Sequence, residues 1–193
     1  MSTVKSKNLQ VGTDATATNN FTIYQPSTPD GTLRIGVGNA DSPTEVGRFN
    51  SNGYIPATAP AFSAYPSAVQ TLSSGTWTTL EFNTELYDTN SNYNTSTYAF
   101  TPTVAGYYNF NALVRSSGVT SRFYTKFVKN GTTNYYGNDF NFAANSLNSN
   151  YSALIYMNGS TDSVVTQAFI QGSGGLALGA NVPIYSAFLA RAA

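Results

Sequence analysis

The stretch FTPTVAGYYNFNALVR, Phe100–Arg115, joins a turn to a long run in which apolar and polar side chains alternate. Pro102 and Gly106 mark the turn, because proline lacks an N–H and glycine tolerates turn conformations. Beyond the turn, four apolar residues share one face of an extended strand over residues 107–115: Tyr108, Phe110, Ala112 and Val114. Asparagines and Arg115 occupy the other face. The stretch therefore predicts a β-strand that buries only one of its faces in a core.

The composition of the whole chain favours the same class. Of its 193 residues 9% are charged, against roughly 25% in an average soluble domain. Its 14 Tyr and 12 Phe argue against disorder, and the scarcity of strong helix formers argues against a helical fold. The formal net charge is +0, so no field attracts nucleic acid. We expect a folded, all-β protein that does not bind nucleic acid.

The residues of common catalytic sites are missing or badly spaced. The chain has no His and no Cys, which excludes a Ser-His-Asp triad, a thiolate metal site and disulfides. Glu81 and Glu85 share a face of one predicted strand, but four residues at ~3.3 Å each set them about 13 Å apart. The paired carboxylates of glycosidases lie roughly 5–9.5 Å apart. The sequence therefore predicts a protein that is not an enzyme, with a polysaccharide hydrolase as the weaker alternative.

Three acidic residues lie in Asn-rich loops, whose oxygens suit calcium: Asp88, Asp139 and Asp162. They lack the D-x-D-x-D-G spacing of a calcium loop. We therefore expect solvated loop acids and no cofactor, with calcium as the alternative.

The first residues, MSTVKSKNLQ, contain no apolar run of the kind that a signal peptide needs. No segment is long and apolar enough to span a bilayer. We expect a chain that is made in a cytosol and is not inserted in a membrane.

A proline-containing segment, YIPATAP (Tyr54–Pro60), divides the chain. Before it lie short alternating pieces, each too small to make a core alone. We expect residues 1–55 to be an extended region of short strands that packs on another chain or forms an intertwined stalk. Residues 56–60 form the spacer, and residues 61–193 form a head.

Within the head, alternation and turn signals predict eight strands. They are Ala61–Val69, Trp77–Leu86, Tyr98–Thr101, Tyr107–Arg115, Arg122–Lys129, Ser152–Met157, Val164–Ile170 and Ile184–Ala190. Asn130-Gly131 predicts a hairpin after Lys129, and Asn158-Gly159 predicts a hairpin between the strands on either side of it. Strands at short intervals, with no helices between them, predict a sandwich or jelly roll.

Five pieces of the head follow each other in a familiar order. They are AFSA (Ala61–Ala64), LEFNTELYDT (Leu80–Thr89), YAFTPTVAGYYNFNALV (Tyr98–Val114), KNG (Lys129–Gly131) and IYSAFLA (Ile184–Ala190). Together they resemble the globular head shared by complement C1q and the tumour necrosis factor superfamily. The chain departs from that family at Thr97-Tyr98 and Thr161-Asp162, where a Thr-Gly and a Gly-Asp are usual.

The resemblance implies a jelly-roll sandwich of about ten strands that forms a homotrimer, with aromatic and aliphatic side chains buried between subunits. The candidate interface residues are Tyr107, Tyr108, Phe110, Tyr124, Tyr185 and Phe188. The chain carries more Tyr and Phe than one small core holds, which agrees with this assignment. The alternative is that these rings fill the core of the single chain.

Tyrosines among Asn and Gly are typical of recognition surfaces, because they give contact area with adaptable hydrogen bonds. The candidate ligand contacts are Tyr87, Tyr93, Tyr135, Tyr136 and Tyr151. Arg115 and Arg122 are candidates for contact with an anion or a glycan, and we expect them close together on neighbouring strands. The alternative is an exposed sheet face on which they pair with Glu81 or Glu85.

A head of this kind on an Asn- and Thr-rich N-terminal region resembles the fibre and decoration proteins of tailed bacteriophages. We therefore expect a virion structural protein, made in the host cytoplasm and displayed on the particle. Residues 1–55 would bind other virion proteins, and the homotrimeric head would bind a glycan or protein on the host surface. The alternative is a capsid decoration or cement protein whose N-terminal arm clamps capsomers. A secreted-type C1q-like binding protein is a third alternative.

Overall fold

The computed structural model describes residues 8–56, 59–118, 120–141, 146–176 and 183–193. In this part of the chain all regular structure is β, apart from the short 3₁₀ helix η1 (Ala17–Asn19). The chain separates into two compact units, Met1–Ala59 and Pro60–Ala193. The predicted all-β, jelly-roll class is confirmed. None of the described helical structure has the length and apolar character that crossing a bilayer requires.

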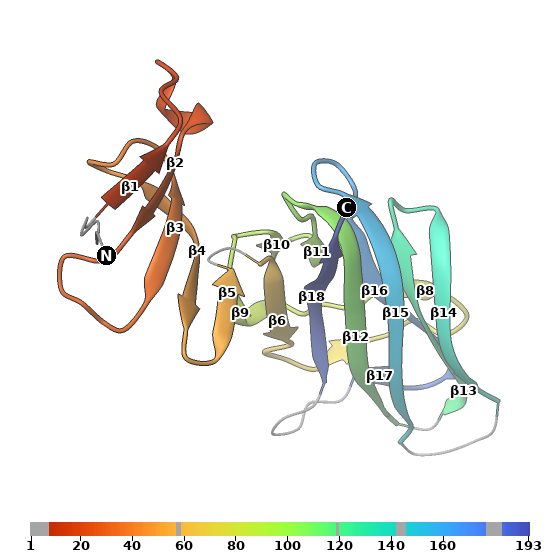
Figure 1. The fold of residues 1–193 in the computed structure, drawn as a ribbon. Coiled ribbons are helices and arrows are strands. Elements are labelled where there is room, and N and C mark those ends of the chain that lie inside the picture. Colours follow the sequence, from red (N-terminus) through yellow and green to blue (C-terminus); the bar gives the residue numbers. More distant parts are fainter. Residues whose placement is uncertain (1–7, 57–58, 119, 142–145, 177–182) are drawn as a thin grey trace. The chain divides into compact units, whose positions relative to one another are not determined.

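The N-terminal unit is one antiparallel sheet in which each strand pairs with the next. Its strands are β1 (Asn8–Val11), β2 (Phe21–Tyr24), β3 (Leu33–Val37), β4 (Thr44–Asn50) and β5 (Gly53–Pro56). The short alternating pieces of the sequence are thus the strands of a single meander (Figure 1).

The second unit, the head, consists of two sheets (Figure 1). The first, called here the β13 sheet, has the strand order β10 (Tyr93–Asn94), β11 (Ala99–Phe100), β16 (Val164–Gly172), β13 (Thr120–Lys129) and β14 (Thr133–Phe140). In addition, β8 (Trp77–Thr79) pairs with β16. The second, called here the β12 sheet, has the strand order β7 (Gln70–Thr71), β17 (Gly175–Leu176), β12 (Ala105–Ser117), β18 (Ile184–Ala192), β6 (Ala61–Tyr65) and β9 (Thr84–Asp88). In addition, β15 (Asn148–Asn158) pairs with β12.

Strand β12, which contains the stretch from Gly106 to Arg115, has the predicted one-sided burial. Its four apolar residues of one face are at most 1% exposed: Tyr108, Phe110, Ala112 and Val114. Gly106, near its start, lies so close to β18 that an added Cβ would collide with the carbonyl oxygen of Arg191 and lie 2.9 Å from the Cα of Ala192. A side chain at position 106 would therefore push two strands of the β12 sheet apart.

Rings from both ends of the head sequence meet in the core between the sheets. Phe62 stacks on Tyr93, with 4.4 Å between centroids, and meets Tyr185 edge-on at 4.9 Å. Burial raises the pKa of both tyrosine hydroxyls. Each hydroxyl donates to a backbone carbonyl, Tyr93 to Phe82 (2.7 Å) and Tyr185 to Val164 (2.9 Å). The core can therefore hold tyrosines as well as phenylalanines, because their polar ends have partners.

The predicted hairpin between β15 and β16 is wrong. β15 pairs with β12 and β16 pairs with β13, so the loop between them crosses from one sheet to the other. The side chain of Asn158 accepts the N–H groups of Ser160, Thr161 and Asp162 and so caps this loop. Asn-Gly indicates a turn, but local turn chemistry does not fix which sheet the next strand joins.

The single strand expected over Trp77–Leu86 is also wrong. It is two strands, β8 in the β13 sheet and β9 in the β12 sheet. Between them the amide of Gln70 serves as the pairing partner, donating to the carbonyl of Thr79 (2.9 Å) and accepting from the N–H of Glu81 (3.1 Å). Glu81 and Glu85 therefore do not share a strand, and the spacing estimated for them does not apply.

The predicted hairpin at Asn130-Gly131 is confirmed, and both residues have positive φ, 52° and 70°. The carboxylate of Asp162 clamps this turn. It accepts from the ammonium of Lys129 (2.6 Å), the side-chain amide of Asn130 (2.7 Å) and the N–H of Asn158 (2.9 Å). The clamp joins the β13–β14 hairpin to the loop that crosses between the sheets.

Replacing Asp162 should destabilise the head in a pH-dependent way. Burial would raise the pKa of the Asp162 carboxyl, but Lys129 and Asn130 hold it below its ordinary value. The ionised group therefore stabilises the fold above about pH 4, the unfolded pKa, and this contribution is lost as pH falls through the folded pKa. Asp162→Asn should cost about 1–3 kcal/mol at pH 7 and less near pH 2.

Thermal unfolding of the wild type and Asp162→Asn at both pH values measures this difference. Glu81→Gln removes an exposed carboxylate of the same head and is the control. A loss of stability that is equal at both pH values would contradict the role given to the ionised Asp162.

Candidate functional site

Aromatic rings gather on the outward face of the β13 sheet. The register sets Phe169 of β16 between Trp77 of β8 and Tyr124 of β13. Tyr136 of β14 and Lys126 of β13 form the next cross-strand pair. Residues of β13 that point the other way, such as Phe123 and Phe127, fill the core. The set called here the aromatic patch is Trp77, Arg122, Tyr124, Lys126, Tyr136 and Phe169.

The rings of the aromatic patch are close enough to form one surface. Centroids of Trp77 and Tyr124 lie 5.1 Å apart, those of Tyr124 and Tyr136 5.2 Å, and those of Trp77 and Phe169 5.7 Å. Together with Arg122 these rings line a shallow hollow of about 190 Å³. Drug-sized ligands occupy pockets of roughly 300–1,000 Å³. The hollow therefore fits one small ring-shaped group rather than a large ligand.

Charged groups border the rings. Arg122 binds the carboxylate of Asp139 through two nitrogens, at 2.9 and 2.6 Å, and these hydrogen bonds lower the pKa of Asp139. The ammonium of Lys126 lies 4.1 Å from the centroid of the Trp77 ring. Burial lowers the pKa of Lys126, and within the described residues no carboxylate lies at ion-pair distance from it. The patch thus offers aromatic faces beside hydrogen-bond donors.

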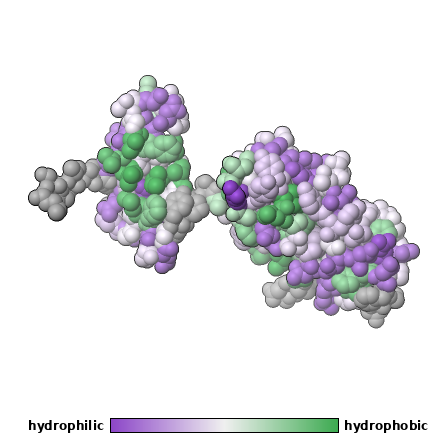
Figure 2. All heavy atoms as spheres, turned by 45° about the vertical axis from the view of Figure 1, so that its right-hand side comes forward, coloured by the Kyte–Doolittle hydropathy of each residue, from purple (hydrophilic) through white to green (hydrophobic). Residues whose placement is uncertain are grey.

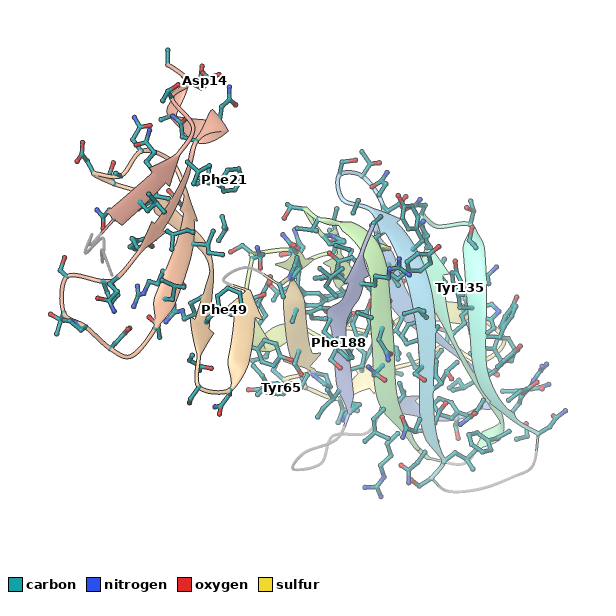
Figure 3. The ribbon with its side chains drawn as sticks, in the orientation of Figure 1. Asp14, Phe21, Phe49, Tyr65, Tyr135 and Phe188 are labelled. Atoms are coloured by element: carbon teal, nitrogen blue, oxygen red, sulfur yellow. The ribbon has the colours of Figure 1, made fainter. Side chains whose placement is uncertain are left out.

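Large apolar side chains are exposed on the outward face of the β12 sheet. Tyr107 is 45% exposed, Leu154 60%, Tyr156 43% and Phe188 48%. The register places them together, because Asn109 lies opposite both Leu154 and Phe188, and Tyr107 lies opposite Tyr156. Phe188 projects from this sheet in Figure 3. These four side chains are called here the apolar strip.

Three of the six predicted interface residues lie on the surface of the head, and three lie in its core. Tyr107 and Phe188 belong to the apolar strip, and Tyr124 belongs to the aromatic patch on the other sheet. The assignment is wrong for the remaining three, which are 0% exposed within the single chain: Tyr108, Phe110 and Tyr185. They face inward because each occupies the core-facing position in its strand, so another subunit cannot reach them.

The tyrosines predicted to contact a ligand also include both exposed and buried residues. Tyr136 is 57% exposed in the aromatic patch, and Tyr87 is 50% exposed on β9. The surface assignment is wrong for Tyr93 and Tyr151, which are 6% and 8% exposed and belong to the core. Tyr135, labelled on β14 in Figure 3, is partly buried and packs against the core.

Arg115 and Arg122 lie in different sheets, so the prediction that they meet on neighbouring strands is wrong. Arg115 donates to the hydroxyl of Ser146 (3.0 Å). Arg122 pairs with Asp139 rather than with Glu81 or Glu85.

The three candidate aspartates each have a separate structural partner. The expected loop placement is wrong for two of them, because Asp88 ends β9 and Asp139 lies in β14. Asp88 accepts from the N–H of Tyr93 (2.7 Å), Asp139 binds Arg122, and Asp162 binds Lys129. In the described part of the chain no three acidic residues gather as a metal site would require.

Sequence reasoning missed Trp77, Lys126 and Phe169 as parts of one site. Each belongs to a predicted strand, and alternation with buried Phe123 and Phe127 places Lys126 on the outward face. The missing information was the order β8-β16-β13-β14, which brings the three strands side by side.

Comparison with known proteins gives the head a family. Residues 61–188 match the family model of the C1q domain. No curated protein matches the chain in sequence.

Solved structures resemble the head in fold. The globular domain of zebrafish complement 1qA aligns with a TM-score of 0.52 and 22% identity, over 69% of this chain and 99% of that one. Murine APRIL aligns with a TM-score of 0.53 and 9% identity, over 68% and 99%. Eiger TNF from S. frugiperda aligns with a TM-score of 0.52 and 8% identity, over 70% and 93%. At these identities the likeness shows the fold alone.

Proposed function

Because the chain belongs to the C1q domain family, whose members are non-catalytic binding modules with heads that typically form homotrimers, we propose that it is a homotrimeric glycan-binding protein of a virus particle. The aromatic patch is the observation that supports a glycan as the ligand. The apolar strip supports the trimer, and the N-terminal unit supports attachment to a larger assembly.

The trimer closes through the outward face of the β12 sheet. Leu154 and Phe188 are 60% and 48% exposed there, on either side of Asn109. Side chains this apolar are typical of the centre of a subunit interface. The opposite sheet carries the aromatic patch, so each subunit keeps that patch free for a ligand.

Leu154→Glu should convert the trimer to monomers at micromolar concentration. The substitution would bury three unpaired carboxylates between subunits, and each costs several kcal/mol to desolvate. Light scattering behind a sizing column measures the mass. Tyr136→Glu places the same charge on a side chain of similar exposure on the other sheet and should leave a trimer. A trimeric Leu154→Glu, or a monomeric wild type, would contradict this interface.

The aromatic patch binds a sugar residue of a host surface glycan. Sugar rings present C–H faces that pack on aromatic rings and hydroxyls that bind charged side chains at the edge of the site. Trp77 and Tyr136 flank Lys126, whose ammonium lies 4.1 and 5.9 Å from the two ring centroids. Three such sites on one trimer raise a weak single-site affinity through multivalency.

Trp77→Ala and Tyr136→Ala should each weaken glycan binding by about 30-fold per site, the effect of losing about 2 kcal/mol at an aromatic hot spot. Binding of the full chain to purified host polysaccharide, measured by calorimetry, gives this ratio. Leu86→Ala removes an apolar side chain that is 61% exposed on the β12 sheet and is the control. If both patch variants bind as the wild type does, the glycan does not occupy the patch.

Three features support the proposed role in a virus particle: the Asn- and Thr-rich composition, the low share of charged residues (9%) and the separate β unit ahead of the head. The N-terminal unit fastens the protein to the virion, and the head faces outward to bind the host. Gold-labelled antibodies against the head, applied to purified particles, should mark the tail. Labelling spread over the capsid would favour a decoration protein, and unlabelled particles would contradict both placements.

A further inference from the structure

The N-terminal sheet has one apolar face whose side chains are partly exposed within the described part of its unit. Leu9 lies opposite Ile23, Val11 opposite Phe21, and Leu33 opposite Phe49, so the register lines them up on one face. These six side chains are between 36% and 57% exposed: Leu9, Val11, Phe21, Ile23, Leu33 and Phe49. Figure 2 shows hydrophobic residues gathered on this unit, and Phe21 and Phe49 project from the same side of the sheet in Figure 3. We call this surface the apolar face.

The other face of the sheet is already closed by polar contacts. Thr22 is buried and its hydroxyl donates to the carbonyl of Gly38 (3.0 Å). Arg34 binds Glu45 (3.0 Å), and Glu45 also binds Arg48 (2.6 Å). The charged residues Arg34, Glu45 and Arg48 thus pair with each other on the polar face, and the described strand residues of the apolar face are uncharged.

The size of the apolar face indicates an interaction site. Six large side chains, each about half exposed, amount to a patch on the order of 500 Å². Soluble monomers rarely expose a larger apolar patch, and patches of this size mark interaction sites. A surface with no charged group fits another surface of the same composition better than a charged one.

The connection between the N-terminal unit and the head is short. Only residues 57–60 separate β5 from β6. Four residues span at most about 14 Å, so a head trimer tethers its three N-terminal units to one assembly. Heads of this family typically form homotrimers, and a head trimer therefore holds three identical apolar faces at high local concentration.

We infer that the apolar face packs against the same face of two further copies of this chain, so that three N-terminal sheets enclose one apolar core. The inference rests on the head trimer proposed above. The arrangement has threefold symmetry, in which a surface that contacts the next copy closes a ring. Particle proteins would then contact the polar face or the strand edges rather than the apolar face.

Cross-linking of the full chain tests this packing. The chain has no Cys, so one introduced thiol reports on one position. Ile23→Cys places the thiol on the apolar face, and Gln10→Cys places it on the neighbouring strand but on the polar face. With a bismaleimide at low micromolar protein, Ile23→Cys should form covalent dimers at least ten times faster than Gln10→Cys.

Light scattering on the same samples separates this inference from the proposed function. A trimer in which both variants cross-link equally slowly would overturn the packing of the sheets and leave the head trimer intact. A monomeric chain would overturn both.

A charge on the apolar face gives a second readout. Phe21→Asp should expose the N-terminal unit to protease at least ten times faster while the head stays trimeric, and Gln10→Asp should not. Unchanged cleavage of Phe21→Asp would contradict the inference. Protection of the apolar face that arises only on purified particles would assign the face to a particle protein instead.

Discussion

Aromatic side chains that meet across the core hold the two sheets of the head together. The tyrosines among them also have a hydroxyl that needs a hydrogen-bond partner inside the core. Tyr185 reaches from the β12 sheet to the carbonyl of Val164 at the start of β16, and Phe62 packs between Tyr185 and Tyr93. Each such contact fixes the distance and the relative position of the sheets. The outward faces follow from it, because every strand that turns one set of residues inward turns the alternate set outward.

The two outward faces differ in chemistry because their strands alternate with different residues. The β12 sheet presents Leu154 and Phe188 in an apolar strip that Arg191 borders, whereas the β13 sheet presents rings beside Arg122 and Lys126. Apolar surface favours a partner that also loses water, and rings bordered by donors favour a ligand with both C–H faces and hydroxyls. One sheet can therefore serve assembly and the other recognition without competition between them.

The N-terminal sheet has one polar and one apolar face, and the apolar face is partly exposed within its own unit. Its charged residues are drawn together on one face by Glu45, which binds Arg34 and Arg48, and its aliphatic and aromatic residues stay outside. A single sheet has no second layer of its own, and the packing against a partner inferred above would supply one. In a homotrimer the partner is supplied by the same sequence, and assembly and folding of this unit become one event.

The sequence by itself determined the all-β class, the one-sided strand after Gly106 and the hairpin at Asn130-Gly131. These features depend on alternation with a period of two and on turn residues, both of which are local. Only the tertiary structure decided that Tyr93 and Tyr151 lie in the core while Tyr136 lies outside, and that β15 and β16 join different sheets. Alternation separates the two faces of a strand, but it does not say which face meets the other sheet, because that depends on the packing of strands distant in sequence. The grouping of Trp77 with Tyr124 has the same origin, since only the order of strands in the β13 sheet brings their rings to 5.1 Å.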